Sequence, residues 1–116
     1  MKTLIWLDDS RDPLTDDWLV FSPIEQPYEV IWVKSYQEFI ERISINGLPT
    51  AICFDHDLDW DSQNIEEKTG MDCALWLVDY CMDLGLVLPL YNIQSANPVG
   101  KENIDKLLKN FIKFYK

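Results

Sequence analysis

Three aspartates stand directly after short apolar runs of the sequence. Asp8 and Asp9 follow residues 3–7, and Asp55 follows residues 51–54. Carboxylates that lie within a few ångströms of one another repel, and a hard divalent cation with oxygen ligands is the usual means of holding them ionised together. We therefore expect Asp8, Asp9 and Asp55 to bind Mg²⁺ or Mn²⁺. The alternative is that one or two of them cap loops or helix N-termini, where aspartate is common.

His56 is the only histidine of the chain, and Asp55 and Asp57 flank it. Neighbouring carboxylates favour the imidazolium form and raise the pKa of a histidine, which suits a general acid or a phosphate contact near neutral pH. We take His56, with Asp57 beside it, as the candidate catalytic pair. A surface histidine in an acidic turn is the alternative.

Several polar residues could hold a phosphate. Arg11 follows the first acidic pair by two residues, and its guanidinium could grip a phosphate or pair with an aspartate. Ser95, Asn97 and Gly100 are expected to form a polar loop before the final helix, whose free amide groups favour anions. Lys101 would add positive charge there. A plain strand-to-helix turn is the alternative for this loop.

Four short apolar runs predict strands, and amphipathic segments between and after them predict helices. Strands are expected at residues 3–7, 29–33, 51–54 and 88–93, and helices at residues 35–46, 69–84 and around 104–115. Ser35 with Glu38 forms a capping box, and Thr69 is the N-cap signal of the second helix. Residues 10–28 contain three prolines and predict a long loop with one helical turn near Trp18. Trp60, in the acidic segment that follows, is a candidate lid residue.

Short apolar strands that alternate with amphipathic helices predict a parallel sheet covered on both faces. We expect one α/β domain over residues 1–116 with three layers, α/β/α. Ligands of such sheets bind at the carboxyl ends of the strands. Three of the four expected strands end in polar clusters, at residues 8–9, 55–57 and 94–97. The candidate residues should therefore meet at one edge of the sheet.

The composition narrows the class of partner. The 116 residues include 20 acids and 10 bases, for a formal net charge of -10. This balance argues against a free-standing binder of duplex DNA, which needs a cationic surface. It fits a protein that binds cations or presents an acidic surface to a basic protein partner. The last sixteen residues hold five lysines against two acids, so the first hundred residues carry -13.

Three cysteines occur without the spacing of a metal site or a disulfide framework. Reduced, buried thiols are therefore expected, as in the cytoplasm. The apolar run at the N-terminus is too short for a signal peptide, and residues 84–93 are too few to span a membrane. We expect a soluble cytoplasmic protein with no membrane partner.

Four ordered segments together resemble the cyclic-phosphate-processing receiver-like domain family, a divergent relative of the response-regulator receiver domain. They span nearly the whole chain: LDDSRDP at 7–13, FDHDL at 54–58, TGMDCALWL at 69–77 and SANPVG at 95–100. The resemblance implies a flavodoxin-like fold. Asp8 and Asp9 match the acidic pair of receivers, and Asp55 matches their phosphoacceptor. The lysine that receivers place at the end of the last strand is not evident.

The resemblance also implies a substrate class. Members of the family are proposed to process or bind cyclic phosphates of nucleotides or RNA ends, in RNA repair or in conflict between bacteria and phages. Their last motif usually begins His-Ser, and here Gln94 stands at the position of that histidine. Glutamine can donate a hydrogen bond to a phosphate but cannot serve as an acid or a base. The site is therefore expected either to bind without turnover or to rely on a metal ion to activate water.

Three functions remain open at this point. The first is a metal-assisted cyclic phosphodiesterase, and the second is a module that sequesters a nucleotide in the same pocket. The third is a receiver-type interaction or inhibitor domain whose acidic face binds a basic protein. One histidine cannot act as acid and base at once without help, which favours weak or absent turnover.

Overall fold

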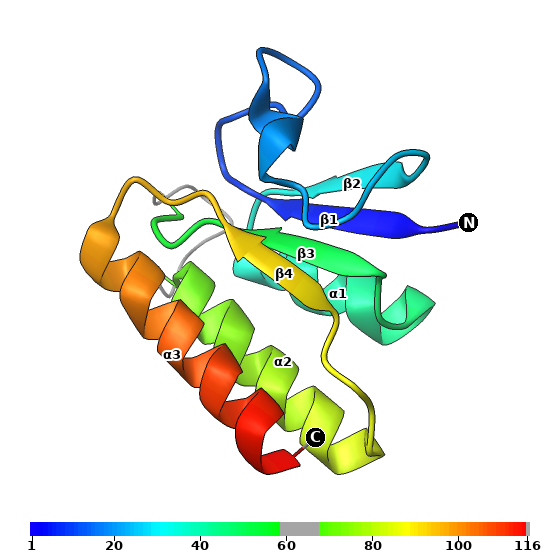
Figure 1. Ribbon diagram of the computed structural model, residues 1–116, viewed down its shortest axis with the longest axis vertical. Helices are drawn as coiled ribbons and strands as arrows, with labels where there is room; N and C mark the ends of the chain where they lie inside the picture. Colours follow the sequence, from blue (N-terminus) through cyan, green and yellow to red (C-terminus); the bar gives the residue numbers. More distant parts are fainter. Residues whose placement is uncertain (59–67, 116) are drawn as a thin grey trace.

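The computed structural model of the protein describes residues 1–58 and 68–115, so the candidate lid residue Trp60 lies outside the described part. The elements follow the order β1 (Thr3–Leu7), η1 (Trp18–Phe21), β2 (Glu29–Val33), α1 (Tyr36–Asn46), β3 (Ala51–Phe54), α2 (Gly70–Leu84), β4 (Leu90–Ile93) and α3 (Pro98–Tyr115). The four strands form one parallel sheet in the order β2-β1-β3-β4 (Figure 1). The prediction of a single receiver-like α/β domain is confirmed, and the strand predicted at 88–93 begins two residues later.

The register aligns the carboxyl ends of the strands. Leu7 pairs with Val33 across β1 and β2, and Phe54 pairs with Ile93 across β3 and β4. The ladder continues one residue further, because the amide groups of three polar residues donate to carbonyls of neighbouring strands. These bonds are Asp8 to Val33 at 3.0 Å, Asp55 to Leu7 at 3.1 Å and Gln94 to Phe54 at 3.0 Å. Asp8, Asp55 and Gln94 therefore stand in one row along the edge of the sheet.

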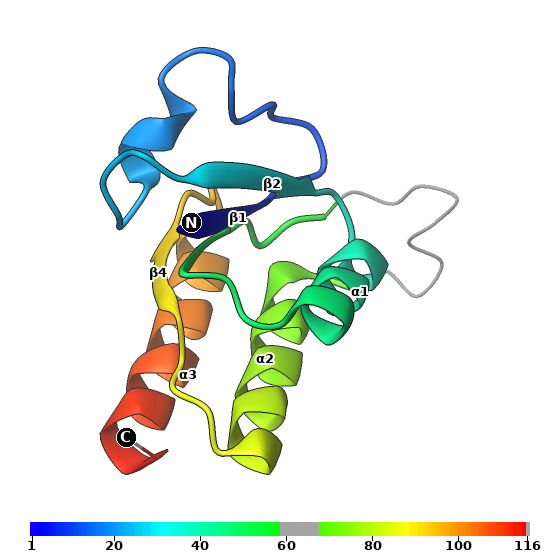
Figure 2. The same cartoon turned by 90° about the vertical axis from the view of Figure 1, so that its right-hand side faces the viewer.

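The two faces of the sheet are covered differently (Figure 2). All three α-helices pack on one face, where side chains such as Ile5, Phe54 and Leu77 form the larger core. The other face, which presents Leu4 and Trp6, is covered by η1 and the loop around it through partly buried aromatic side chains. The proline-rich loop thus supplies this layer without an α-helix, since proline inside a helix removes a hydrogen bond and clashes with the preceding turn.

Local capping signals set the helix boundaries as the sequence predicts. The Ser35 side chain accepts from the amide of Glu38, and Thr69 and Asp72 form a reciprocal capping box at the start of α2. The final helix differs from the prediction. It begins at Pro98, because the Asn97 side chain accepts the Gly100 amide at 3.0 Å and proline suits the first helical position. Gly100 and Lys101 therefore lie within α3 and not in a loop before it.

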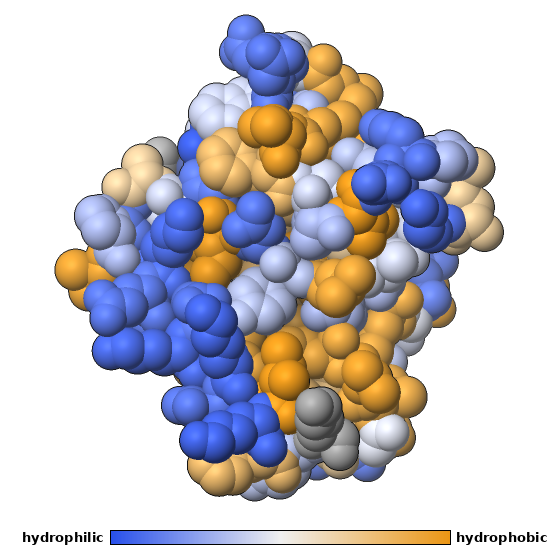
Figure 3. Space-filling view, viewed as in Figure 1, coloured by the Kyte–Doolittle hydropathy of each residue, from blue (hydrophilic) through white to orange (hydrophobic). Residues whose placement is uncertain are grey.

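The surface reflects the uneven charge of the sequence. Hydrophilic side chains gather over α3, and apolar side chains gather over the segment between α2 and β4 (Figure 3). In that segment Val87 is 86% exposed. None of the described helices is long and apolar enough to cross a membrane.

Candidate functional site

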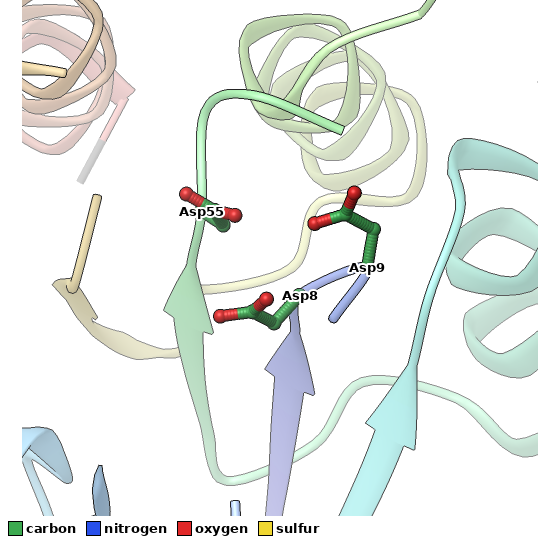
Figure 4. A group of neighbouring side chains, drawn as sticks. All are labelled: Asp8, Asp9 and Asp55. Carbon is green, nitrogen blue, oxygen red and sulfur yellow. The ribbon is translucent and has the colours of Figure 1, made fainter. Parts of the chain in front are cut away.

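The carboxylates of Asp8, Asp9 and Asp55 form a cluster at the carboxyl edge of the sheet (Figure 4). Asp8 and Asp9 follow β1, Asp55 follows the adjacent strand β3, and one oxygen of each lies within 4.8 Å of the others. Asp8 is fully buried and Asp55 is 6% exposed. The predicted convergence of these carboxylates is therefore confirmed, and it results from the neighbouring, parallel placement of β1 and β3.

Asp8 organises the turn that follows β1. Its Oδ1 accepts the amide N–H groups of Ser10 at 3.1 Å and Arg11 at 3.0 Å, and its Oδ2 accepts the Nε–H of Arg11 at 2.7 Å. An aspartate that accepts amides two and three residues ahead closes a tight local turn. The backbone of Arg11 is therefore fixed, and its side chain is directed back to the cluster.

The guanidinium of Arg11 connects three strand ends. Nη2 lies 3.3 Å from Asp55 Oδ1, and Nη1–H donates to the carbonyl of Gln94 at 3.3 Å. The ring of Trp18 stacks beside the guanidinium, with its centroid 4.7 Å from the central carbon. The sequence left two roles open for Arg11, binding a phosphate or pairing with an aspartate. In this structure Arg11 pairs with Asp8 and Asp55.

The Asp55 carboxyl has a raised pKa. Its burial and then the charge of Asp8 raise its pKa from 3.8 to about 6, with a smaller contribution from Asp9. Arg11 and the amide of His56, which donates to Asp55 Oδ1 at 2.9 Å, oppose this rise. A buried carboxyl beside two others is poorly compensated, which is the situation that a bound cation would relieve.

His56 is oriented by a chain of hydrogen bonds. Its Nδ1 lies 2.9 Å from Asp57 Oδ1, and Asn97 Nδ2 donates to the same oxygen at 3.3 Å. An ionised carboxylate can only accept, so Nδ1 carries the proton and Nε2 is left for another partner. The hydrogen bond from His56, together with that from Asn97, lowers the pKa of Asp57.

Two glycines whose positioning role the sequence does not reveal hold the loop after β3. The His56 ring lies against Gly100 in the first turn of α3, where an added Cβ would overlap the ring. At the start of α2, the amide of Gly70 donates to the carbonyl of His56 at 2.7 Å, and a Cβ there would overlap the carbonyl of Asp55. A glycine inside the first turn of a helix is the sequence signal that could have indicated such contacts.

The remaining candidates lie in three different surroundings. Gln94 is 4% exposed, its Nε2 donates to the carbonyl of Leu7 at 3.0 Å, and its Oε1 has no hydrogen-bond partner among the described residues. Ser95 Oγ accepts the Asn97 amide at 3.1 Å. Lys101 lines a groove of about 550 Å³ beside β4 together with residues such as Asp105. The structure thus groups Gln94 with Arg11 at the sheet edge and places Lys101 in the groove.

The sequence of the chain matches the model of a known protein family. The model of the cyclic-phosphate processing receiver domain matches residues 3–110. The chain belongs to this family. A comparison with curated proteins finds no match. The acidic cluster is the feature that this domain shares with the metal site of receivers.

The donor set fits a hard divalent cation. Asp8, Asp9 and Asp55 offer carboxylate oxygens, which are the ligands that Mg²⁺ and Mn²⁺ prefer. Each ionised carboxylate has about four acceptor positions, so the hydrogen bonds to Asp8 and Asp55 leave lone pairs for coordination. These three residues could therefore hold the ion, with Arg11 as the competing positive group.

Proposed function

We propose that this domain binds the cyclic phosphate of a nucleotide or of an RNA end at the carboxyl edge of the sheet and opens it by hydrolysis. Membership of the family supports the substrate class. The observation that carries the proposal is that an oriented histidine stands next to a member of the acidic cluster, because His56 directly follows Asp55 in the loop after β3. A bound cation can activate water, and a proton donor can protonate the leaving oxygen, so both parts can contribute to opening a phosphodiester ring.

His56 is the proton donor in this proposal. Water attacks phosphorus, and a P–O bond to the water oxygen forms while that oxygen releases one proton to solvent. The P–O bond to one sugar oxygen breaks at the same time, and His56 regains from solvent the proton that it gives up. The imidazolium of His56 gives its Nε2 proton to that leaving oxygen, while Asp57 accepts from Nδ1 and stabilises the positive ring. Asn97 donates to Asp57 and caps α3, so we assign it a positioning role.

The cation would be Mg²⁺ or Mn²⁺, held by Asp8, Asp9 and Asp55. When bound, such an ion polarises the phosphate and lowers the pKa of a coordinated water. Arg11 and Ser95 are the residues of this edge that we assign to the phosphate. For Lys101 we propose a contact with more distant parts of a ligand, since it lines the groove beside β4.

Turnover of 2′,3′-cyclic nucleotides with Mg²⁺ or Mn²⁺ tests the proposal. We expect hydrolysis by the unmodified protein and a loss of roughly 10²–10⁴-fold in kcat for His56→Ala. Nucleotide affinity should change far less, because the proton matters most in the transition state. Lys113→Ala, a change of a cation in the last turn of α3, is the control. Hydrolysis that persists in His56→Ala would contradict the assignment of the proton donor.

A second candidate function is binding without turnover, and Gln94 favours it. The carboxamide stands where the family has a histidine, and it is buried and bonded to Leu7, so it offers no acid or base to a substrate. In that case nucleotides raise the melting temperature without being hydrolysed, and Gln94→His creates turnover. If nucleotides cause neither stabilisation nor turnover, the remaining function is that of an interaction domain with a basic protein as its partner.

A further inference from the structure

Arg11 contacts two of the three carboxylates that a cation would use. Its Nε–H donates to Asp8 Oδ2, and its Nη2 faces Asp55 Oδ1. The two aspartates belong to different strands, so a single guanidinium spans the gap between β1 and β3. The planar group of arginine is suited to such a bridge, since it donates in two directions at once.

The position of this guanidinium is built into the fold. The Arg11 amide is fixed on Asp8 Oδ1, its Nη1–H donates to the Gln94 carbonyl, and the Trp18 ring flanks it. The Arg11 side chain is nevertheless 24% exposed. The backbone of Arg11 is therefore anchored independently of its guanidinium, which reaches solvent and can leave the carboxylates for a ligand there.

A divalent cation and this guanidinium must compete. Both are positive, both need Asp8 and Asp55, and the effective dielectric constant at such buried oxygens is well below that of water. An ion that coordinates the cluster would lie close to the guanidinium and would be repelled by it. Removal of the arginine charge should therefore strengthen cation binding. The same change leaves the negative charges of Asp8 and Asp55 without the positive charge that now offsets them.

We propose that Arg11 is the built-in counter-ion of the cluster, and that a divalent cation binds by displacing its guanidinium from Asp8 and Asp55. This inference rests on the proposed function for the cation site. It adds a link between the two ligands, because the displaced guanidinium becomes available to a phosphate. Cation and phosphate should then each strengthen the binding of the other through Arg11.

A titration with Mn²⁺ alone tests the displacement, with free Mn²⁺ followed by electron paramagnetic resonance. We expect Arg11→Gln to bind Mn²⁺ about tenfold or more tightly than the unmodified protein. Arg42→Gln, which removes the other arginine of the chain from α1, should bind as the unmodified protein does. Arg11→Lys keeps the charge but loses the planar bridge, and its affinity should fall between the two.

Each outcome of the Mn²⁺ titration either supports or overturns the proposal. Tighter binding by Arg11→Gln supports the proposal, as does binding by that variant when the unmodified protein binds none. Equal or weaker binding overturns it, and so does a lack of binding by every protein. If Arg11→Gln shows no cooperative unfolding in urea, Arg11→Lys decides by the same criterion of tighter binding.

Inorganic phosphate then tests the link. It should increase the Mn²⁺ affinity of the unmodified protein and not that of Arg11→Gln, and an equal increase in both would overturn the link. The Mn²⁺ titration contains no nucleotide and requires no turnover. A failure of this inference is therefore distinguishable from a failure to hydrolyse cyclic nucleotides.

Discussion

Replacing Asp55 by asparagine should stabilise the protein when no metal is present. The Asp55 side chain is 8% exposed, and it lies beside Asp8 and Asp9 with Arg11 as a countercharge. Burial and the neighbouring carboxylates raise its pKa from 3.8 to about 6. Above that pH the folded protein must hold an unfavourable charge, which the unfolded chain solvates without penalty.

The size of the effect follows from the difference between these two pKa values. It corresponds to about 3 kcal/mol of destabilisation above pH 6. The raised value already includes the attractions of Arg11 and the His56 amide. An NH₂ group next to Arg11 should offset part of the gain, so we expect Asp55→Asn to raise the free energy of unfolding by about 1–3 kcal/mol. For a domain of this size, each kcal/mol corresponds to roughly 3–6 °C in Tm.

The pH dependence makes the test specific. Between the unfolded pKa near 3.8 and the folded value near 6, the folded state binds more protons, so the unmodified protein loses stability as pH rises. Urea unfolding in EDTA should therefore show little difference between Asp55→Asn and the unmodified protein at pH 3.5 and the full difference at pH 7.5. Added Mg²⁺ should stabilise the unmodified protein more than the variant, because the variant lacks a ligand.

Asp105→Asn is a control whose effect on stability should be opposite to that of Asp55→Asn. The hydrogen bond from Lys109 is the largest cause of the lowered pKa of Asp105, so its charge contributes stability above the unfolded pKa. This variant should be less stable than the unmodified protein at pH 7.5. Our assignment of Asp55 is refuted if Asp55→Asn is also less stable in EDTA at pH 7.5, because Asp55 would then make structural bonds that the charge strengthens.

Three further variants test how His56 is held. Gly100→Ala should force the His56 ring away from α3 and lower the free energy of unfolding by about 1–3 kcal/mol in urea, and an unchanged stability would show that the ring moves freely. Asn97→Ala should cost about 0.5–2 kcal/mol through the lost cap of α3. Asn97→Ser keeps a capping oxygen but loses the contact with Asp57. Turnover should therefore fall, while the free energy of unfolding stays within about 0.5 kcal/mol of that of the unmodified protein. Equal turnover would exclude a positioning role for Asn97.

The order of strands and helices was determined by patterns within the sequence. Ser35 and Thr69 start their helices because an N-cap needs only a side-chain oxygen and an amide three residues away. The convergence of Asp8 and Asp55 could also be predicted, since parallel strands end on one side of their sheet. The second face could not be predicted in the same way, because its cover depends on aromatic contacts of the loop around Trp18 with distant strands.

The partners of the site residues were decided by the tertiary structure. From the sequence, Arg11 could bind a phosphate or an aspartate with equal reason. Asp8 lies three residues before Arg11, and the adjacency of β1 and β3 placed a second carboxylate, that of Asp55, within its reach. Gly100 became a positioning residue because α3 packs beside the loop that carries His56. Local patterns report contacts within about four residues. The contacts of Arg11 with Asp55 and of His56 with Gly100 join segments that are brought together only when the sheet and its helices have packed.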